Sequence, residues 1–71
     1  MGDFKGVGEG VYEVRLDFGP GFRVYLAPDG KSVVILLCGG DKATQRKDIV
    51  AAKSYWTDYR TRKDAEKRKL R

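Results

Sequence analysis

The residues of this chain that could take part in catalysis or ligand binding are mainly arginine and lysine. Arg15 and Arg23 fall on one face of a predicted β-hairpin, and Lys42 follows a Gly-Gly pair near the expected start of a helix. A guanidinium binds phosphate oxygens in a bidentate manner, and a helix N-terminus attracts anions. Because the sequence contains no histidine, His-based acid–base catalysis, a Ser-His-Asp triad and His-ligated metal sites are excluded. The cations indicate an anion site that needs no metal or other cofactor.

The positive charge is concentrated in the C-terminal part of the sequence. The 71 residues carry a formal net charge of +5. Residues 1–41 contain four Lys or Arg and six Asp or Glu, whereas residues 42–71 contain eleven and four. Such a basic segment is typical of proteins that bind a polyanion, usually nucleic acid. A solvated helix end has the same composition, so both interpretations stay open at this point.

The length and composition are those of one small globular domain. The longest apolar run, Val33–Cys38, is far shorter than the roughly 20 residues of a membrane span, and the N-terminus lacks a signal-peptide pattern. The single cysteine, Cys38, excludes an intramolecular disulfide and is expected to act as a small buried apolar residue. These features predict a cytoplasmic protein that does not bind membranes.

Three strands and one helix are expected to position the cations. Residues 1–10 are rich in glycine and predict a flexible lead-in. Alternating apolar and polar residues over 11–18 predict a first strand, and two more strands follow over 22–27 and 32–38, each after a glycine-containing turn. The expected fold class is therefore α+β, with a three-stranded antiparallel meander followed by one C-terminal helix.

The turn lengths predict how the strands pair. A three-residue first loop and a two-residue second loop give the pairs Phe18–Phe22, Leu16–Val24, Val14–Leu26, Leu26–Val33, Val24–Ile35 and Phe22–Leu37. In this register the apolar residues share one face, which is expected to be buried. Arg23 then lies opposite Asp17 on the polar face, so a simple cross-strand ion pair is an alternative to a functional site.

The helix is expected to begin near Asp41 or Thr44, since either residue can cap an N-terminus. An amphipathic stripe follows, and its two aromatic residues, Trp56 and Tyr59, are predicted to belong to the core. Residues 62–71 are basic, nearly without apolar residues, and predicted to fray.

The third predicted strand is apolar on both faces, because Val34, Leu36 and Cys38 lie opposite the shared apolar face. A strand of this kind normally lies in a sheet that is covered on both sides. Since one helix covers only one side, the sequence predicts an uncovered apolar face that marks an interaction surface, with a homodimer as one way to cover it.

Two segments resemble a known toxin family. They are Gly21-Phe22-Arg23-Val24-Tyr25 and the run Leu36-Leu37-Cys38-Gly39-Gly40-Asp41-Lys42, followed by Thr44-Gln45 and Asp48-Ile49. Residues 10–56 resemble the C-terminal two-thirds of RelE/ParE superfamily toxins, most closely the HigB-like addiction-module killer proteins. Family members usually begin with two helices that pack on the sheet, and this chain departs from the family by lacking them.

The resemblance implies a function and a set of site residues. The family fold cuts messenger RNA on the ribosome by attack of a 2′-hydroxyl on the adjacent phosphate, which requires positioning and charge stabilisation. By resemblance Arg15, Arg23 and Lys42 would be catalytic, while Arg46 and Tyr25 would bind RNA, the tyrosine by stacking on a base. The implied protein is the toxin of a type II toxin–antitoxin module, with residues 11–61 as its core and a cognate antitoxin, RNA and the ribosome as partners.

Two other functions share these features. A non-catalytic basic module would bind nucleic acid or protein through charge alone, and its affinity would fall steeply with salt. A ParE-like protein would inhibit gyrase and leave RNA intact. Glu13, which stands where some RelE relatives have a basic residue, departs from the catalytic pattern of the family.

Overall fold

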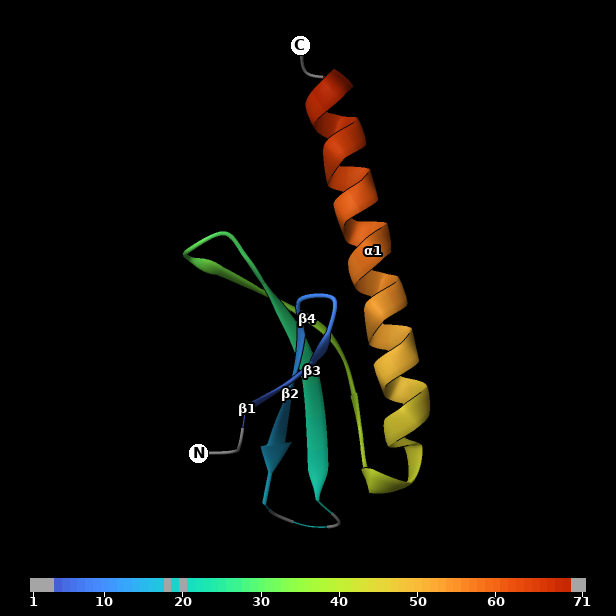
Figure 1. The fold of residues 1–71 in the computed structure, drawn as a ribbon. Helices are drawn as coiled ribbons and strands as arrows, with labels where there is room; N and C mark the ends of the chain where they lie inside the picture. The colour runs from blue at the N-terminus through green and yellow to red at the C-terminus, as the bar shows by residue number, and fades with distance from the viewer. Residues whose placement is uncertain (1–3, 18, 20, 70–71) are drawn as a thin grey trace.

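The computed structural model describes residues 4–17, 19 and 21–69. Four antiparallel strands form one sheet in the order β1-β2-β3-β4, and one long helix follows them (Figure 1). The elements are β1 (Phe4–Gly8), β2 (Val11–Leu16), β3 (Phe22–Asp29), β4 (Val33–Gly40), a short 3-10 helix η1 (Lys42–Thr44) and α1 (Gln45–Lys69). The fold is α+β as predicted, but the predicted three-stranded sheet is wrong because the sheet has four strands.

The additional strand comes from the segment that was predicted to be a flexible lead-in. In β1, Lys5 lies opposite Glu13 of β2. Gly8 and Gly10 adopt φ angles of 106° and 84° in the tight turn that joins the two strands, a conformation that glycine adopts without strain. A segment with two glycines among five residues has little strand propensity of its own, so its pairing with β2 favours the strand.

The β2–β3 hairpin pairs two residues away from the predicted register. Leu16 pairs with Phe22 and Val14 with Val24, so five residues form the connection instead of three. Phe18, the predicted partner of Phe22, lies outside the described residues. Because side chains alternate with a period of two, this shift keeps every residue on its predicted face.

The β3–β4 hairpin, in contrast, exchanges the faces of the first half of β4, Val33–Leu36, relative to the prediction. Asp29 pairs with Val33 across a three-residue loop, where the predicted loop has two residues. Leu26 pairs with Leu36 and not with Val33, a shift of three residues, and any odd shift moves the side chains concerned to the opposite face. A β-bulge between Tyr25 and Leu26 then shifts the register once more, so that Cys38 pairs with Tyr25.

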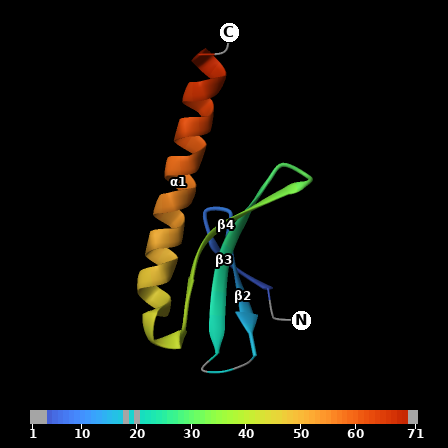
Figure 2. The same ribbon diagram turned by 180° about the vertical axis from the view of Figure 1, so that it is seen from behind.

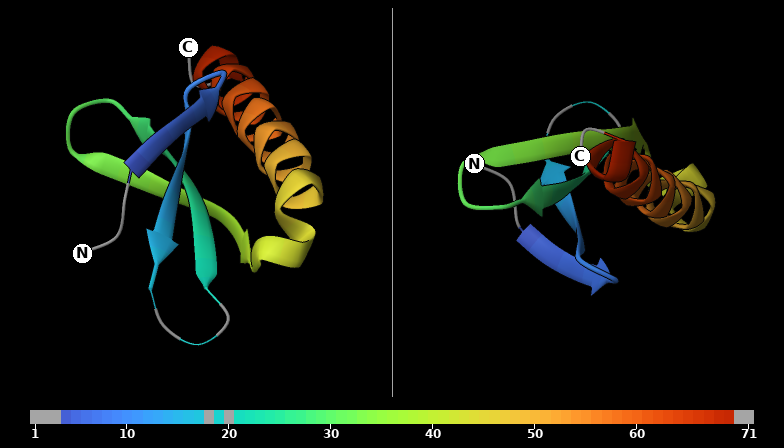
Figure 3. Two further views of the ribbon diagram at one scale, coloured as in Figure 1. Left: turned by 60° about the horizontal axis from the view of Figure 1, so that its bottom comes forward. Right: turned by 90° about the horizontal axis from the view of Figure 1, so that it is seen from above.

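The helix covers the face of the sheet that the sequence pattern marks as polar. The buried apolar core consists of Val11, Tyr25 and Ala27 from the sheet and Ala52 and Trp56 from α1. Figure 3 shows α1 along one side of the twisted sheet. Burial of each large side chain contributes about 1.5–3 kcal/mol, which holds the helix on this face. The predicted place of Trp56 in the core is confirmed, and Tyr59 packs against it.

The other face of the sheet is apolar and uncovered within the described part of the chain. Leu36 is 70% exposed and Val34 56% exposed, and Tyr12 and Phe22 on the same face are also exposed. An uncovered apolar face is therefore present, as predicted, but it is the shared apolar face that was expected to be buried, and that expectation is wrong. Its surface is of the kind that binds a partner.

Asp41 caps the helical segment, as predicted. Its carboxylate accepts hydrogen bonds from the backbone N–H groups of Ala43 at 3.0 Å and Thr44 at 3.2 Å. The Thr44 hydroxyl in turn donates a 2.6 Å hydrogen bond to the Asp48 carboxylate. A methyl group at Gly40 would meet the Asp48 carboxylate and the Thr44 hydroxyl, so a larger residue there requires these two side chains to move.

α1 is longer than the sheet that it covers. It continues to Lys69, through the segment that was predicted to fray, and residues 70–71 lie outside the described part. At 1.5 Å per residue it spans about 37 Å, and the molecule measures 48 × 24 × 18 Å. Figures 1 and 2 show its C-terminal part extending past the strands. Among the described residues, no helix combines the length and the apolar character needed to cross a membrane.

Candidate functional site

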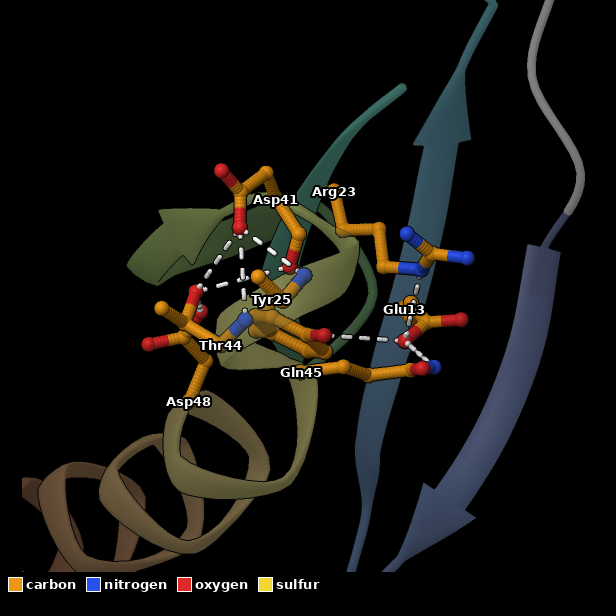
Figure 4. Close-up of polar contacts among 8 residues, drawn as sticks. Glu13, Arg23, Tyr25, Asp41, Thr44, Gln45 and Asp48 are labelled. Carbon is orange, nitrogen blue, oxygen red and sulfur yellow. Dashed lines mark hydrogen bonds and ion pairs between the residues drawn. The ribbon is translucent and has the colours of Figure 1, made fainter. Parts of the chain in front are cut away.

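A buried carboxylate lies between the sheet and the start of α1. Glu13 of β2 is only 5% exposed. The Tyr25 hydroxyl of β3 donates a 2.9 Å hydrogen bond to Glu13 Oε2, and Gln45 Nε2 of α1 donates a 2.8 Å hydrogen bond to the same oxygen (Figure 4). The strand register brings this about, since Glu13 pairs directly with Tyr25. A buried carboxylate is tolerated only with such partners.

A buried guanidinium lies beside this carboxylate. Arg23 is 6% exposed, and its Nε lies 3.7 Å from Glu13 Oε2. The separation allows strong attraction between the charges but is too long for a hydrogen bond. Arg23 Nε has no hydrogen-bond partner among the described residues. Buried donors are rarely left unpaired, so the attraction of the Glu13 carboxylate must compensate this nitrogen through charge alone.

The two buried groups open into a pocket of about 500 Å³. Its walls consist of Phe4, Lys5, Glu13, Arg15, Arg23 and Gln45. Lys5 reaches the pocket because β1 pairs with β2, and Arg15 because it pairs with Arg23 across β2 and β3. Three cations against one carboxylate make the pocket favourable for an anion.

Arg15 and Arg23, which were predicted from the resemblance, therefore meet at one pocket. Their arrangement differs from the predicted one, because Arg23 pairs with Arg15 and not with Asp17. The expected Arg23–Asp17 ion pair is wrong, and Glu13 is the carboxylate beside the guanidinium. Like charges directly opposite each other on neighbouring strands repel, and the carboxylate of Glu13 offsets that repulsion.

Lys42 and Arg46 do not line this pocket. Lys42 is the first residue of η1 and Arg46 lies in the first turn of α1, and both are exposed. Along the chain, Lys42 is three residues and Arg46 one residue from Gln45.

Tyr25 has no exposed ring surface. The predicted stacking of Tyr25 on an RNA base is therefore wrong. Burial and the hydrogen bond to Glu13 raise the pKa of the Tyr25 hydroxyl well above its ordinary value of 10.0. The hydroxyl consequently stays protonated over a wide pH range and holds the carboxylate of Glu13 in place.

Four pocket residues, Phe4, Lys5, Glu13 and Gln45, were not predicted as site residues from the sequence. Glu13 alternates with apolar residues, a pattern that predicts a solvent-facing strand residue. Lys5 lies in the glycine-rich segment that was predicted to be a flexible lead-in. Gln45 belongs to the segment that resembles the toxin family, but no role was predicted for it. The one available signal was the recurrence of charged and hydroxyl-bearing residues on the odd positions of β2 and β3, where Glu13 and Tyr25 occur.

Comparisons with known proteins give one informative relative. An uncharacterized protein from Haemophilus influenzae is 58% identical to this chain over 53 residues, which cover 75% of this chain and 54% of the relative. The chain therefore spans about half the length of the curated relative that it matches. No family model and no solved structure matches the chain.

Proposed function

We propose that this chain is the toxin component of a type II toxin–antitoxin module of the RelE/HigB type, and that its pocket binds and cleaves an RNA phosphodiester. The observation that supports it is the convergence of three cations, Lys5, Arg15 and the buried Arg23, on the wall of one pocket. This arrangement suits a phosphate group. The resemblance of residues 10–56 to the toxin family supplies the reaction class.

In the proposed reaction, the 2′-oxygen of the ribose attacks the adjacent phosphorus and the 5′-oxygen leaves. The 2′-hydroxyl loses its proton and the leaving oxygen gains one, so the products are a 2′,3′-cyclic phosphate and a 5′-hydroxyl. Arg15 and Arg23 stabilise the negative charge on the non-bridging phosphate oxygens. Glu13 is a positioning residue, because it holds the guanidinium of Arg23 beside the pocket.

The proposed partners follow from the two surfaces of the molecule. A cognate antitoxin with an acidic segment would cover the cationic side of the pocket, including Lys42 and Arg46. A second copy of the chain would cover the apolar face around Leu36 and so form a homodimer. An mRNA substrate places the protein in the cytoplasm.

The test must use variants that keep the fold. Arg23→Ala is unsuitable because it leaves the buried Glu13 carboxylate without its cation. Arg23→Lys keeps the charge but loses the planar fork, and Arg15→Gln removes the charge of an exposed side chain. Each is expected to slow RNA cleavage by about 10²-fold or more, the order seen when one charge-stabilising group is lost. Lys31→Gln, in the exposed β3–β4 loop, is the matched control and should cleave like the wild type.

The substrate itself gives the sharper control. An RNA with a single 2′-deoxynucleotide at the cleaved position should bind with unchanged affinity and remain intact, since the nucleophile is absent. Wild-type protein that binds RNA without cutting either substrate would contradict the enzymatic proposal and favour a non-catalytic basic module. Inhibition of gyrase supercoiling with intact RNA would favour the ParE-like alternative.

A further inference from the structure

The charged side chains around the pocket share one face of the sheet. Lys5 of β1 pairs with Glu13 of β2, and Arg15 of β2 pairs with Arg23 of β3. Directly opposed residues of antiparallel strands point to the same face, and Glu13 and Arg15 are two positions apart on one strand. All four side chains therefore lie on the face that α1 covers, and all four line the pocket. The register thus places a lysine of β1 beside the two arginines.

The arginines and the carboxylate of the pocket do not supply a proton to a ligand. A guanidinium keeps its proton in a protein, so neither Arg15 nor Arg23 gives one up. The Glu13 carboxylate accepts hydrogen bonds from Tyr25 and Gln45 on Oε2, and in this arrangement it acts only as an acceptor. These groups hold charge in the pocket, but the proposed cleavage also requires one proton to reach the leaving 5′-oxygen.

Lys5 differs from these groups in exposure and in chemistry. It is exposed, and it forms no ion pair with any residue that the structure describes. A lysine side chain is an ammonium ion with three N–H donors on a flexible stem. Unlike a guanidinium, an ammonium group passes a proton to a stronger base. Among the residues that line the pocket, Lys5 is therefore the one that can protonate a bound ligand.

We infer that Lys5 is the general acid that protonates the leaving 5′-oxygen, an inference that rests on the proposed function. As the 2′-oxygen forms its bond to phosphorus, the bond between phosphorus and the 5′-oxygen breaks, and Lys5 Nζ gives one proton to that oxygen. The 2′-hydroxyl proton passes to a water molecule of the solvent. The neutral amine of Lys5 then takes up a proton from the solvent, so the complete reaction neither consumes nor releases protons.

The arrangement of the cations suits this division of roles. Arg23 is held by Glu13 at its Nε, and its terminal nitrogens point away from that carboxylate (Figure 4). A guanidinium fixed in this way stabilises charge on the non-bridging oxygens, which stay bound to phosphorus throughout the reaction. The 5′-oxygen, in contrast, moves away from phosphorus as it leaves. The exposed and flexible side chain of Lys5 can follow that oxygen.

The variant Lys5→Arg separates the proton of this residue from its charge. It keeps the positive charge, but a guanidinium does not release a proton. Because Lys5 is exposed, the variant should fold like the wild type. It should bind the uncleavable 2′-deoxy RNA with unchanged affinity and cleave ordinary RNA at least about 100-fold more slowly, since general acid catalysis contributes about 10²–10⁴-fold. Lys31→Arg, at an exposed lysine of the β3–β4 loop, is the matched control and should cleave at the wild-type rate.

A modified RNA tests whether Lys5 acts on the leaving oxygen. This RNA carries sulfur in place of the 5′-oxygen at the cleaved bond, and a thiolate leaves without being protonated, because thiols are far stronger acids than alcohols. The wild type should cut both RNAs. Lys5→Arg should cut the sulfur-containing RNA at close to the wild-type rate, so that its loss of activity is confined to ordinary RNA.

Two outcomes would overturn the role of Lys5 alone. Equal slowing of both RNAs by Lys5→Arg would mean that the residue acts through its position and donates no proton. An unchanged rate on ordinary RNA would mean that it takes no part in the reaction. Both results leave the ribonuclease proposal standing, because the wild type still cuts RNA. A wild type that cuts neither RNA would refute the ribonuclease proposal, and the role of Lys5 with it.

Discussion

Removing one partner of the Glu13–Arg23 pair is expected to destabilise the protein more than removing both. The two side chains are 7% exposed each, so a single deletion leaves the other charge buried and uncompensated. The cost of such a deletion is about 3–5 kcal/mol. A domain of this length has a free energy of unfolding of roughly 4–11 kcal/mol. Glu13→Leu or Arg23→Met alone should therefore remove about a quarter of the stability or more.

The double variant Glu13→Leu/Arg23→Met removes both buried charges and keeps the side-chain volume. Replacing a buried ion pair in this way is often neutral or stabilising by about 1–4 kcal/mol. Here the Tyr25 hydroxyl loses its acceptor, and an unpaired buried hydroxyl costs about 1–3 kcal/mol. The double variant is therefore expected near the wild-type stability, and the additional change Tyr25→Phe should raise it further.

Urea unfolding at neutral pH measures these differences. Trp56 is the single tryptophan and is 5% exposed, so its fluorescence reports loss of the contact between α1 and the sheet. Single variants of Glu13 and Arg23 that lie within about 1 kcal/mol of the wild type would refute the reasoning, since water must then reach the pair. A double variant less stable than both single variants would also contradict it.

Three further predictions concern other parts of the fold. Because burial and the hydrogen bond to Glu13 raise the pKa of Tyr25 above its ordinary 10.0, its contribution to stability is complete below that pH and is lost as the pH rises through the folded-state value. The urea midpoint of the wild type should therefore fall more steeply above pH 10.0 than that of Tyr25→Phe. Gly40→Ala should lower the free energy of unfolding by about 1–3 kcal/mol, since its methyl group would displace Asp48; an unchanged midpoint would contradict the tight bend. The wild type should self-associate in sedimentation experiments, and Leu36→Lys on the uncovered face should shift it to monomer, whereas a monomeric wild type would contradict pairing through this face.

Local patterns in the sequence predicted most of the elements. Alternation identified β2 and β3, a short apolar run identified β4, and the helical stripe with Trp56 identified α1 and its place in the core. Capping by Asp41 was predicted from its residue type alone. The presence of an uncovered face was predicted because one helix covers only one of the two faces of a sheet, whatever the register of the strands.

The side of the sheet that α1 covers was not predictable in the same way. A strand that is apolar on both faces does not fix its own register, so the extra residue in the β3–β4 loop and the bulge at Tyr25 had no local signal. As a result, the polar positions Glu13 and Arg23 are buried, and the more apolar face is open. Binary patterning assumes that polar residues face solvent, and this assumption fails where charged residues form a buried pair.

The residues of the site were predicted only where they belong to a local sequence motif. Arg15 and Arg23 were found because they belong to a recognisable segment around β2 and β3. Lys5 requires the pairing of β1, and Glu13 requires the correct buried face, so neither can be assigned from its neighbours in the chain.

The position of β4 has a consequence for handling the protein. In the order β1-β2-β3-β4, this strand forms hydrogen bonds along only one of its edges within the described residues. Val33–Cys38 has high strand propensity and contains neither a charge nor a proline, which is the composition of segments that assemble into steric zippers. Stored at high concentration, the chain is expected to seed amyloid fibrils through this edge, which thioflavin T fluorescence would detect.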